Sequence, residues 1–297
     1  MQDQSQALKY AERGAILSII VYILLTCLKL IIGYLGHSDA LIADGWNNFT
    51  DILSNTFILI GLRLARTPSD LEHQYGHWKI EHIASLLTSI VMFLISISVL
   101  INPIKRIITH QSETPDMLSG IVGLFCALLI LFVYNYNYKL AKKVQSHALF
   151  AAAKDNLSDI YSSLGAGIAA ICGRFGWHLF DNIVAIIIGL LILHSAISIF
   201  KQSAFVLSDG FDQTLIDEYT SCILKINGVD GIISIRGRSY GSLIYLDIDL
   251  YMNPQMTVKQ SHDLTELIEE RLYNEYDVAH AEIHVEPTPR KEHNYGN

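Results

Sequence analysis

The segment ADGWNNFTD, residues 43–51, places two aspartates and two asparagines within a long and otherwise apolar stretch. Asp44, Asn47, Asn48 and Asp51 recur every three or four residues, a spacing that gathers side chains on one face of an α-helix. A charged side chain at the centre of a bilayer costs about 2.5–3.5 kcal/mol on insertion scales. Such side chains therefore usually face the interior of a helix bundle or a water-filled cavity. The segment predicts a membrane-spanning helix with a polar, functional face.

The composition of the whole chain also favours a membrane protein. Of its 297 residues, 51% are hydrophobic and 17% are charged, and the mean hydropathy is +0.32. Soluble domains usually have about a quarter of their residues charged. The net charge of −8 provides no basic surface, which argues against nucleic acid as a partner. No phosphate-binding loop, nucleophile elbow or HExxH motif is present, so we predict a protein that is not an enzyme and needs no cofactor.

We predict six membrane-spanning helices, because a span needs roughly 20 mostly apolar residues. They cover residues 14–35, 40–64, 82–108, 117–140, 147–173 and 178–206. Polar residues interrupt the second and fifth spans. Lysine and arginine gather before the first span, between the second and third, and between the fourth and fifth. By the positive-inside rule, both chain ends are expected in the cytoplasm, with the spans in the inner (plasma) membrane.

The composition changes after residue 208. Two amphipathic helical segments and three strand-like runs follow in the order helix, strand, strand, helix, strand. Thr257 is a candidate N-cap for the second of these helices, and Pro287 is expected to stop the last strand. We predict a six-helix membrane domain at 1–208, an α+β domain of ferredoxin or metallochaperone type at 209–290, and a flexible tail at 291–297.

The second and fifth spans each carry a pair of polar residues one helical turn apart. Asn47 and Asp51 form one such pair, and Asp155 and Asp159 form the other. Two helices that present such pairs to each other can place four oxygen ligands around one ion. Three carboxylates without enough basic partners are best explained by a bound metal ion or by protons.

Spacing alone leaves two questions open. The polar groups could hydrogen-bond one helix to another without binding an ion, although this does not account well for the carboxylates. Spacing also does not decide whether the second span contributes Asn47 and Asp51 or its neighbours Asp44 and Asn48. Lys29 in the first span could pair with one aspartate, or extend towards the membrane surface.

The pattern resembles the cation diffusion facilitator family over essentially the whole chain. The resemblance rests on SDALIADGWNNFTDILSN at 38–55, on HQYGHWKIE at 73–81 and on the paired motif in the fifth span. The family implies dimeric exporters that exchange a divalent metal ion for protons by alternating access. The implied partners are the metal ion, protons, membrane lipid and a second copy of the chain. The resemblance implies a transport site made of Asn47, Asp51, Asp155 and Asp159.

Two positions depart from the zinc-transporting members of the family. Those members often have aspartate at the position of Asn47 and histidine at that of Asp155. Carboxylate and carbonyl ligands suit Mg, Ca and Mn, whereas imidazole suits zinc. The set therefore resembles the manganese-exporting branch, and we predict Mn²⁺ efflux with Fe²⁺, Zn²⁺ or Co²⁺ as alternatives. A carrier without proton coupling, or a membrane scaffold, is the competing class.

Further candidate residues lie outside the transport site. In the family, a loop like that of Asp70, His73 and His77 binds a second ion. The competing interpretation is a solvated polar loop. Lys79 and Asp209 resemble an ion pair of the family at the junction between the membrane domain and the tail.

The C-terminal domain resembles part of the metal cluster found in the tails of family members. The matching positions are Asp249, His262, His284 and Glu286. Ile233 stands where a further histidine ligand is often found. We therefore expect a depleted site that binds metal weakly or serves as dimer surface.

Overall fold

The computed structural model describes residues 2–65, 67–110, 113–144, 147–240 and 243–289. The chain forms two compact units, one of Met1–Leu59 with Ser85–Phe200 and one of Ile60–Ala84 with Lys201–Asn297. The segment 60–84 thus belongs to the same compact unit as the C-terminal residues. The predicted tail at 291–297 lies outside the described residues.

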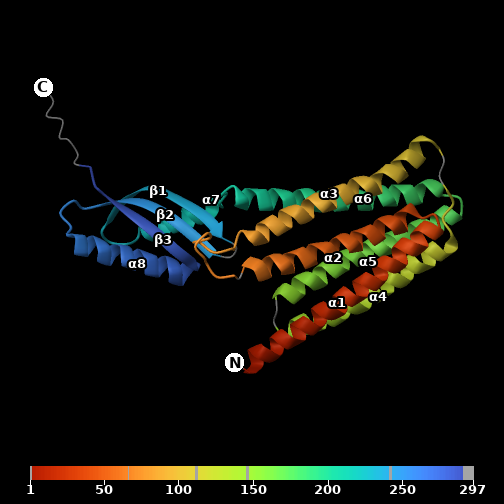
Figure 1. Ribbon diagram of the computed structural model, residues 1–297, viewed down its shortest axis with the longest axis horizontal. Helices are drawn as coiled ribbons and strands as arrows, with labels where there is room; N and C mark the ends of the chain where they lie inside the picture. Colours follow the sequence, from red (N-terminus) through yellow and green to blue (C-terminus); the bar gives the residue numbers. More distant parts are fainter. Residues whose placement is uncertain (1, 66, 111–112, 145–146, 241–242, 290–297) are drawn as a thin grey trace. The chain divides into compact units, whose positions relative to one another are not determined.

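Six long helices make up most of the chain, as predicted (Figure 1). They are α1 (Gln2–Leu35), α2 (Asp39–Ala65), α3 (Ile80–Ile108), α4 (Met117–Val144), α5 (His147–Arg174) and α6 (His178–Leu207). Helix α1 begins twelve residues before the predicted span at residue 14, because glutamine, alanine, leucine, lysine and glutamate in this segment all favour helix.

The helices differ in how well they suit a bilayer. Among the described residues, three are long and apolar enough to span it: Ile80–Ile108, Met117–Lys142 and Leu179–Leu207. The apolar part of α1 within the described residues, Ile19–Leu35, is shorter than these three helices. Helices α2 and α5 are not among these three, and polar residues interrupt the sequences of both. These are the two helices that carry the paired polar residues.

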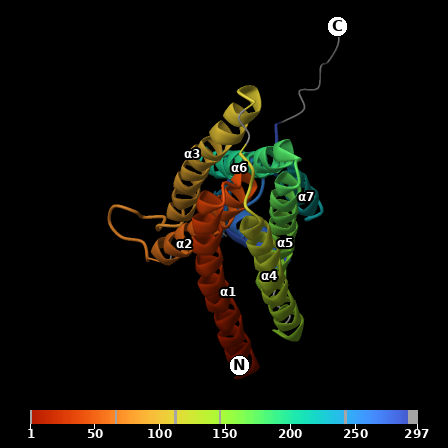
Figure 2. The ribbon, with the colours of Figure 1, turned by 90° about the vertical axis from the view of Figure 1, so that its right-hand side faces the viewer.

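Helices α4 and α5 pack closely, and Figure 2 shows them side by side. The contact is made through glycines. A methyl group added at Gly123 would lie 2.7 Å from the Cα atom of Gly167. Small residues allow such close approach of helix backbones in membranes. This contact limits how α5 can rotate about its axis, and so helps determine which of its side chains face inward.

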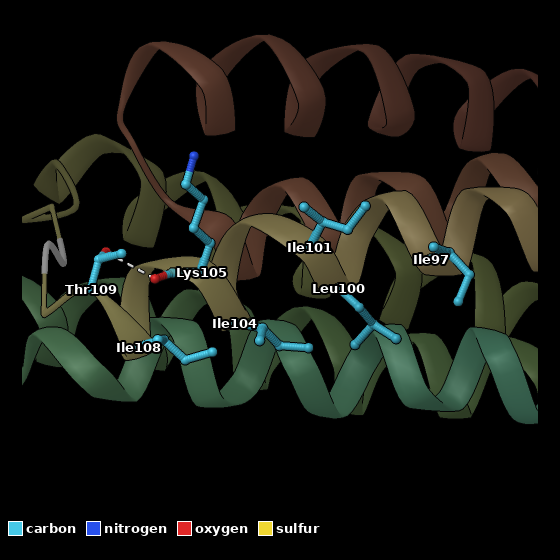
Figure 3. A pocket seen from close by; sticks show the side chains of 7 residues that line it. All are labelled: Ile97, Leu100, Ile101, Ile104, Lys105, Ile108 and Thr109. Carbon is cyan, nitrogen blue, oxygen red and sulfur yellow. Dashed lines mark hydrogen bonds between the residues drawn. The ribbon is translucent and has the colours of Figure 1, made fainter.

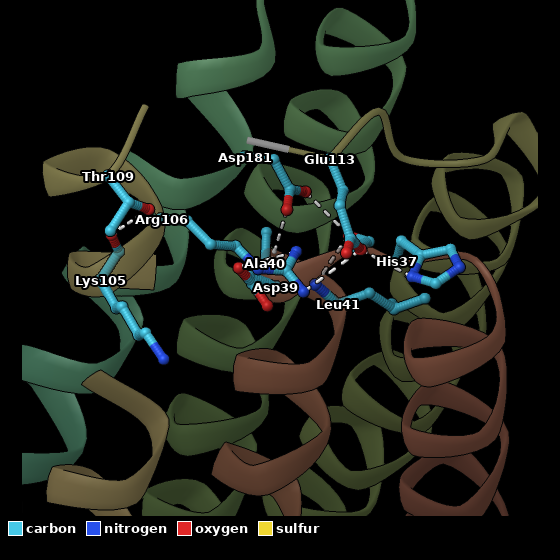
Figure 4. Close-up of polar contacts among 10 residues, drawn as sticks. His37, Asp39, Ala40, Leu41, Lys105, Arg106, Thr109, Glu113 and Asp181 are labelled. Carbon is cyan, nitrogen blue, oxygen red and sulfur yellow. Dashed lines mark hydrogen bonds and ion pairs between the residues drawn. The ribbon is translucent and has the colours of Figure 1, made fainter. Parts of the chain in front are cut away.

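The start of α2 is held by Ser38 and by α6. The Ser38 hydroxyl accepts the backbone N–H of Leu41 at 3.2 Å, as an N-cap residue does, and donates to Asp181 at 2.7 Å. Asp181 also accepts the backbone N–H of Ala40 at 3.2 Å (Figure 4). These bonds tie the first turn of α2 to the first turn of α6.

An ion-pair network extends this anchor to α3. Arg106 lies 3.3 Å from Asp39 and 3.3 Å from Glu113, and His37 lies 2.7 Å from Glu113 (Figure 4). Further along α3 lies an apolar pocket of about 470 Å³ (Figure 3). Lys105 is the one charged residue among those that line it. The pocket does not include any of the predicted metal ligands.

The C-terminal residues fold into a two-layer α/β arrangement in the predicted order. Its elements are α7 (Gln213–Ile223), β1 (Val229–Tyr240), β2 (Leu243–Met252), α8 (Val258–Tyr276) and β3 (Val278–Pro287). The sheet has the order β1-β2-β3, with β1 and β2 antiparallel and β2 and β3 parallel. Alternate residues of β2, including Leu246, Ile248 and Leu250, pack against both helices, so one face of the sheet is covered.

Thr257 caps α8, as predicted. Its side chain accepts the backbone N–H of Gln260, and the Gln260 side chain accepts the backbone N–H of Thr257 at 2.9 Å. This reciprocal capping box satisfies two donors that the first turn of the helix would otherwise leave unpaired. The helix is the crossover that makes β3 parallel to β2.

Candidate metal centre

Asn47 on α2 and Asp159 on α5 are in direct contact. The Asn47 side-chain Nδ2 donates to Asp159 Oδ1 at 3.1 Å, which leaves the Asn47 carbonyl oxygen available as a ligand. Asp159 is 7% exposed. The Oδ2 atom of Asp51 is buried and has no hydrogen-bond partner among the described residues. A buried carboxylate oxygen without a partner is energetically costly, and a cation is one way to satisfy it.

Asp155 lies at the more exposed edge of this group. Its side chain is exposed, whereas Asn156, Asp159 and Ser163 are buried and form the inward stripe of α5. The predicted pair of Asp155 and Asp159 is therefore divided between the edge and the interior of the helix bundle. Asp51 is still near enough to Asp155 and Asp159 to experience their charges.

Tyr22 of α1 also contacts Asp159. The spacing of polar residues in α2 and α5 did not predict this contact. The Tyr22 hydroxyl oxygen lies 2.5 Å from Asp159 Oδ2 and 2.8 Å from the side-chain oxygen of Asn156. A tyrosine has one proton to donate. If that proton goes to Asp159, turning the Asn156 amide would let its otherwise unpartnered Nδ2 donate to the Tyr22 oxygen. Asp159 then receives donors from both α1 and α2.

A second buried polar cluster lies on the same helices. Lys29 of α1 lies 2.7 Å from Asp44 and donates to Ser163 at 2.8 Å and to Asn48. The structure therefore separates the two pairs of α2: Asn47 contacts Asp159, whereas Asp44 and Asn48 contact Lys29. The signal in α1 that would have predicted this is the spacing of Tyr22, Thr26 and Lys29, which places three polar residues on one helix face.

The predicted loop residues come together before α3. Asp70 Oδ1 lies 3.2 Å from His73 Nδ1, and Asp70 Oδ2 lies 3.5 Å from His77 Nε2. The centres of the two imidazole rings are 4.3 Å apart. Backbone N–H groups of His73 and Glu72 donate to the Asp70 carboxylate, and they hold its pKa below its ordinary value. His77 Nδ1 lies 3.4 Å from the carbonyl oxygen of Thr67, which orients the ring and leaves Nε2 towards Asp70.

This loop cluster is the tightest acidic and histidine group in the described part of the chain. It is the one group there whose ligand atoms all lie within 4.8 Å of one another. Asp51, Asp155 and Asp159 do not meet this criterion, so the carboxylates of the membrane set are spaced more widely in this state. The polar group that contacts them from α2 is the amide of Asn47, which donates to Asp159.

Lys79 and Asp209 form the predicted ion pair, with 2.8 Å between Lys79 Nζ and Asp209 Oδ1. Lys79 Nζ also lies 4.9 Å from the centre of the Tyr240 ring, on which Tyr75 stacks at 5.6 Å. These contacts hold the segment before α3 against the end of β1. They account for its grouping with the C-terminal residues.

The four candidate residues of the C-terminal domain do not form a compact ligand group in the described chain. Asp249 accepts a hydrogen bond from Ser234 at 2.6 Å, and it lies beside His284 in the register of β2 and β3. His284 lies 3.0 Å from Glu286, whereas His262 on α8 lies 3.4 Å from Glu266. Each histidine is thus paired with a carboxylate near it in sequence.

Comparison with known proteins covers nearly the whole chain. The cation efflux transmembrane domain matches residues 15–208, and the cation efflux protein cytoplasmic domain matches residues 211–288. Manganese efflux system protein MneS of Bacillus subtilis is 42% identical over 289 residues, covering 97% of this chain and all of its own length. Manganese efflux system protein MneP of the same organism is 30% identical over 292 residues, covering 95% and 98%.

Among solved structures, a C-terminal domain of MamM is 20% identical and covers 26% of this chain and 98% of its own, with a TM-score of 0.25. The two family models together cover the helical domain and the α+β domain that follows. The chain is a multi-pass membrane protein with a cytoplasmic C-terminal domain, and it belongs to the cation efflux family of metal exporters, the cation diffusion facilitators.

Proposed function

We propose that this protein exports Mn²⁺ from the cytoplasm in exchange for protons, by alternating access. The observation that carries the proposal is the all-oxygen ligand set of Asn47, Asp51 and Asp159, in which one oxygen of Asp51 is buried without a partner. Amide and carboxylate oxygens favour a hard cation such as Mn²⁺ over zinc, which prefers imidazole and thiolate. Asp155 supplies the fourth ligand from the exposed edge of the group.

Proton exchange rests on the balance of charges around the site. The buried cation nearby, Lys29, is already paired with Asp44. Lys154 acts on Asp155, but Asp51 and Asp159 form no ion pair with a lysine or arginine among the described residues. A divalent ion and protons are then alternative means of neutralising the same carboxylates, so that the arrival of one favours the release of the other.

The names of two relatives support manganese as the cargo. MneS and MneP of Bacillus subtilis are both called manganese efflux proteins, and this chain aligns with almost their full lengths. In the proposed orientation, both chain ends lie in the cytoplasm. We further propose a homodimer, since the C-terminal domain matches the cytoplasmic domain of cation efflux proteins.

The loop cluster has a separate proposed role. Asp70, His73 and His77 provide one carboxylate oxygen and two imidazole nitrogens, a set that accepts Mn²⁺ or Zn²⁺. Because these residues belong to the same compact unit as the C-terminal domain, we assign them to regulation rather than transport. The C-terminal set of Asp249, His262, His284 and Glu286 would then contribute weak binding or dimer surface.

The test is transport by the full chain reconstituted in proteoliposomes. An imposed pH gradient should drive accumulation of Mn²⁺ more strongly than that of Zn²⁺, Fe²⁺ or Co²⁺, and Asp51→Ala should abolish it. Strong Zn²⁺ uptake without Mn²⁺ uptake would overturn the choice of metal. Mn²⁺ uptake that does not respond to the pH gradient would instead favour a carrier without proton coupling. Retained activity in Asp51→Ala would remove the proposed site.

A further inference from the structure

The cluster around Lys29 has the chemistry of a cation site. Its ammonium group lies 2.7 Å from Asp44 Oδ2 and 2.8 Å from the hydroxyl oxygen of Ser163, and it also donates to the side-chain oxygen of Asn48. These ligands are a carboxylate, a hydroxyl and an amide oxygen, drawn from two helices. All four side chains are fully buried. The ammonium group thus occupies the centre of an oxygen cage.

The cage offers more ligand capacity than Lys29 uses. Asp44 Oδ1 is buried and has no hydrogen-bond partner among the described residues, whereas the equally unpartnered Asn48 Nδ2 is a donor and adds no ligand. A lysine presents three donors and carries one positive charge. A divalent cation takes about six oxygen ligands at distances near 2.0–2.6 Å, and it would use the second oxygen of Asp44. Lys29 therefore satisfies the cage only in part.

The cage also repeats the transport set one helical turn away. On α2, Asp44 and Asn48 precede Asn47 and Asp51 by three residues each. On α5, Ser163 follows Asp159 by four residues. One turn of helix corresponds to a rise of about 5.4 Å. Lys29 is near enough to Asp51 and Asp159 for its charge to act on both.

We propose that Asp44, Asn48 and Ser163 form a second site for a hard divalent cation, and that the ammonium group of Lys29 occupies it as a tethered cation. Lys29 then keeps the metal ion at the neighbouring transport set, because the next oxygen cage already holds a positive charge. Removing that charge opens the cage to a free metal ion. The inference rests on the proposed function in taking Mn²⁺ as the ion and in taking the neighbouring polar set as its transport site.

The experiment counts Mn²⁺ ions bound to the purified full chain in detergent, by equilibrium dialysis with metal analysis. Lys29→Met should bind one more Mn²⁺ ion per chain than the unmodified protein. Lys29→Met combined with Asp44→Asn should lose that extra ion, although it keeps the same neutral side chain at position 29. An unchanged count in Lys29→Met would overturn the proposal, as would an extra ion that persists after Asp44→Asn.

Two further variants keep the test decisive. Lys29→Met leaves a buried carboxylate unpaired, and loss of one partner of a buried ion pair is strongly destabilising. If this variant does not fold even with Mn²⁺ present, Lys29→Gln serves instead, because it also removes the positive charge but keeps an amide that can donate a hydrogen bond to Asp44. This variant should bind one more Mn²⁺ ion than the unmodified protein, and adding Asp44→Asn to it should remove that ion. If the variant binds no additional ion, the proposal is overturned. Asp51→Asn in the unmodified protein reports separately on the transport set: its failure to lose a bound ion would count against the proposed function and not against the second site.

Discussion

The Asp159 carboxylate receives side-chain hydrogen bonds from two helices, and no other aspartate of the proposed transport set does so among the described residues. Tyr22 of α1 reaches one of its oxygens at 2.5 Å, and Asn47 of α2 reaches the other at 3.1 Å. A partner that holds a metal ligand in place contributes to affinity even though it does not touch the metal. Tyr22 is therefore a positioning residue for Asp159.

Tyr22→Phe should weaken Mn²⁺ transport mainly through its apparent affinity. The substitution removes the donor to Asp159 but keeps the aromatic ring, so the KM for Mn²⁺ should rise by about 10-fold, in the range found for partners of metal ligands. Initial rates in proteoliposomes over a range of Mn²⁺ concentrations measure this. Tyr34→Phe is the matched control, since Tyr34 lies on the same helix and is 57% exposed. Equal KM values in the two variants would show that the hydroxyl of Tyr22 has no such role.

Asn47→Asp should change metal preference. A carboxylate at this position cannot donate to Asp159 and would lie against another negative oxygen, so the site would carry one more negative charge. We expect the ratio of Mn²⁺ to Zn²⁺ transport rates to fall, as measured by uptake of each metal under the same pH gradient. Asn55→Asp adds the same group at an exposed position of α2 and serves as the control. If Asn47→Asp, Asn55→Asp and the unmodified protein had the same ratio of Mn²⁺ to Zn²⁺ transport rates, the assignment of Asn47 would be contradicted.

Among the helices, the pair α4 and α5 has the closest backbone contact described here. Gly123 and Gly167 meet where no Cβ atom can be accommodated. Their approach holds α5 in the rotation that turns Asn156, Asp159 and Ser163 inward and leaves Asp155 more exposed. The packing of small residues thus determines which polar groups reach α1 and α2.

Gly123→Ala should destabilise the membrane domain. The new methyl group would lie 2.7 Å from backbone Cα and 2.9 Å from backbone N of Gly167, and backbone atoms cannot move aside as a flexible side chain can. Overpacking of this kind costs about 1–3 kcal/mol. Thermal unfolding in detergent should show a lower Tm. Gly165→Ala is the control, because its methyl group would meet only Val184 at 3.9 Å. A Tm for Gly123→Ala as high as that of the control would contradict the packing argument.

At the scale of the whole molecule, the proposed transport set and the loop cluster belong to different compact units. The transport set lies in the unit of Met1–Leu59 and Ser85–Phe200, and the loop cluster lies in the unit that includes Ile60–Ala84. Ions that bind only the folded state stabilise it by mass action, by about 2.7 kcal/mol at 100 times the dissociation constant. Two sites without shared ligands should contribute separately.

Mn²⁺ should therefore raise the Tm of the full chain in two separable parts. Asp51→Asn should remove one part of the increase and His77→Ala the other, and the combined variant should lose the sum of both. His194→Ala, at an exposed position of α6, should leave the increase unchanged. Differential scanning fluorimetry with and without Mn²⁺ measures these shifts. A combined loss far from the sum would mean that the two sites are coupled.

Much of the architecture could be predicted from local patterns. Runs of apolar residues predicted the six helices, and the spacing of Asn47 with Asp51 and of Asp155 with Asp159 predicted which helices carry polar faces. Capping chemistry predicted that Thr257 starts α8. The residues of α1 were harder to predict, because Tyr22 lies in a strongly apolar span and contacts Asn156 and Asp159, more than 130 positions away in sequence.

The sequence by itself determined that α2 and α5 present carboxylates inside a membrane domain, since helical periodicity places residues three and four apart on one face whatever the surroundings. Only the tertiary structure decided which groups on those faces meet. In the folded chain, Asn47 donates a hydrogen bond to Asp159, and Asp44 forms an ion pair with Lys29. The reason is that spacing defines a face, but the rotation of each helix is determined by packing, here by the close approach of Gly123 and Gly167.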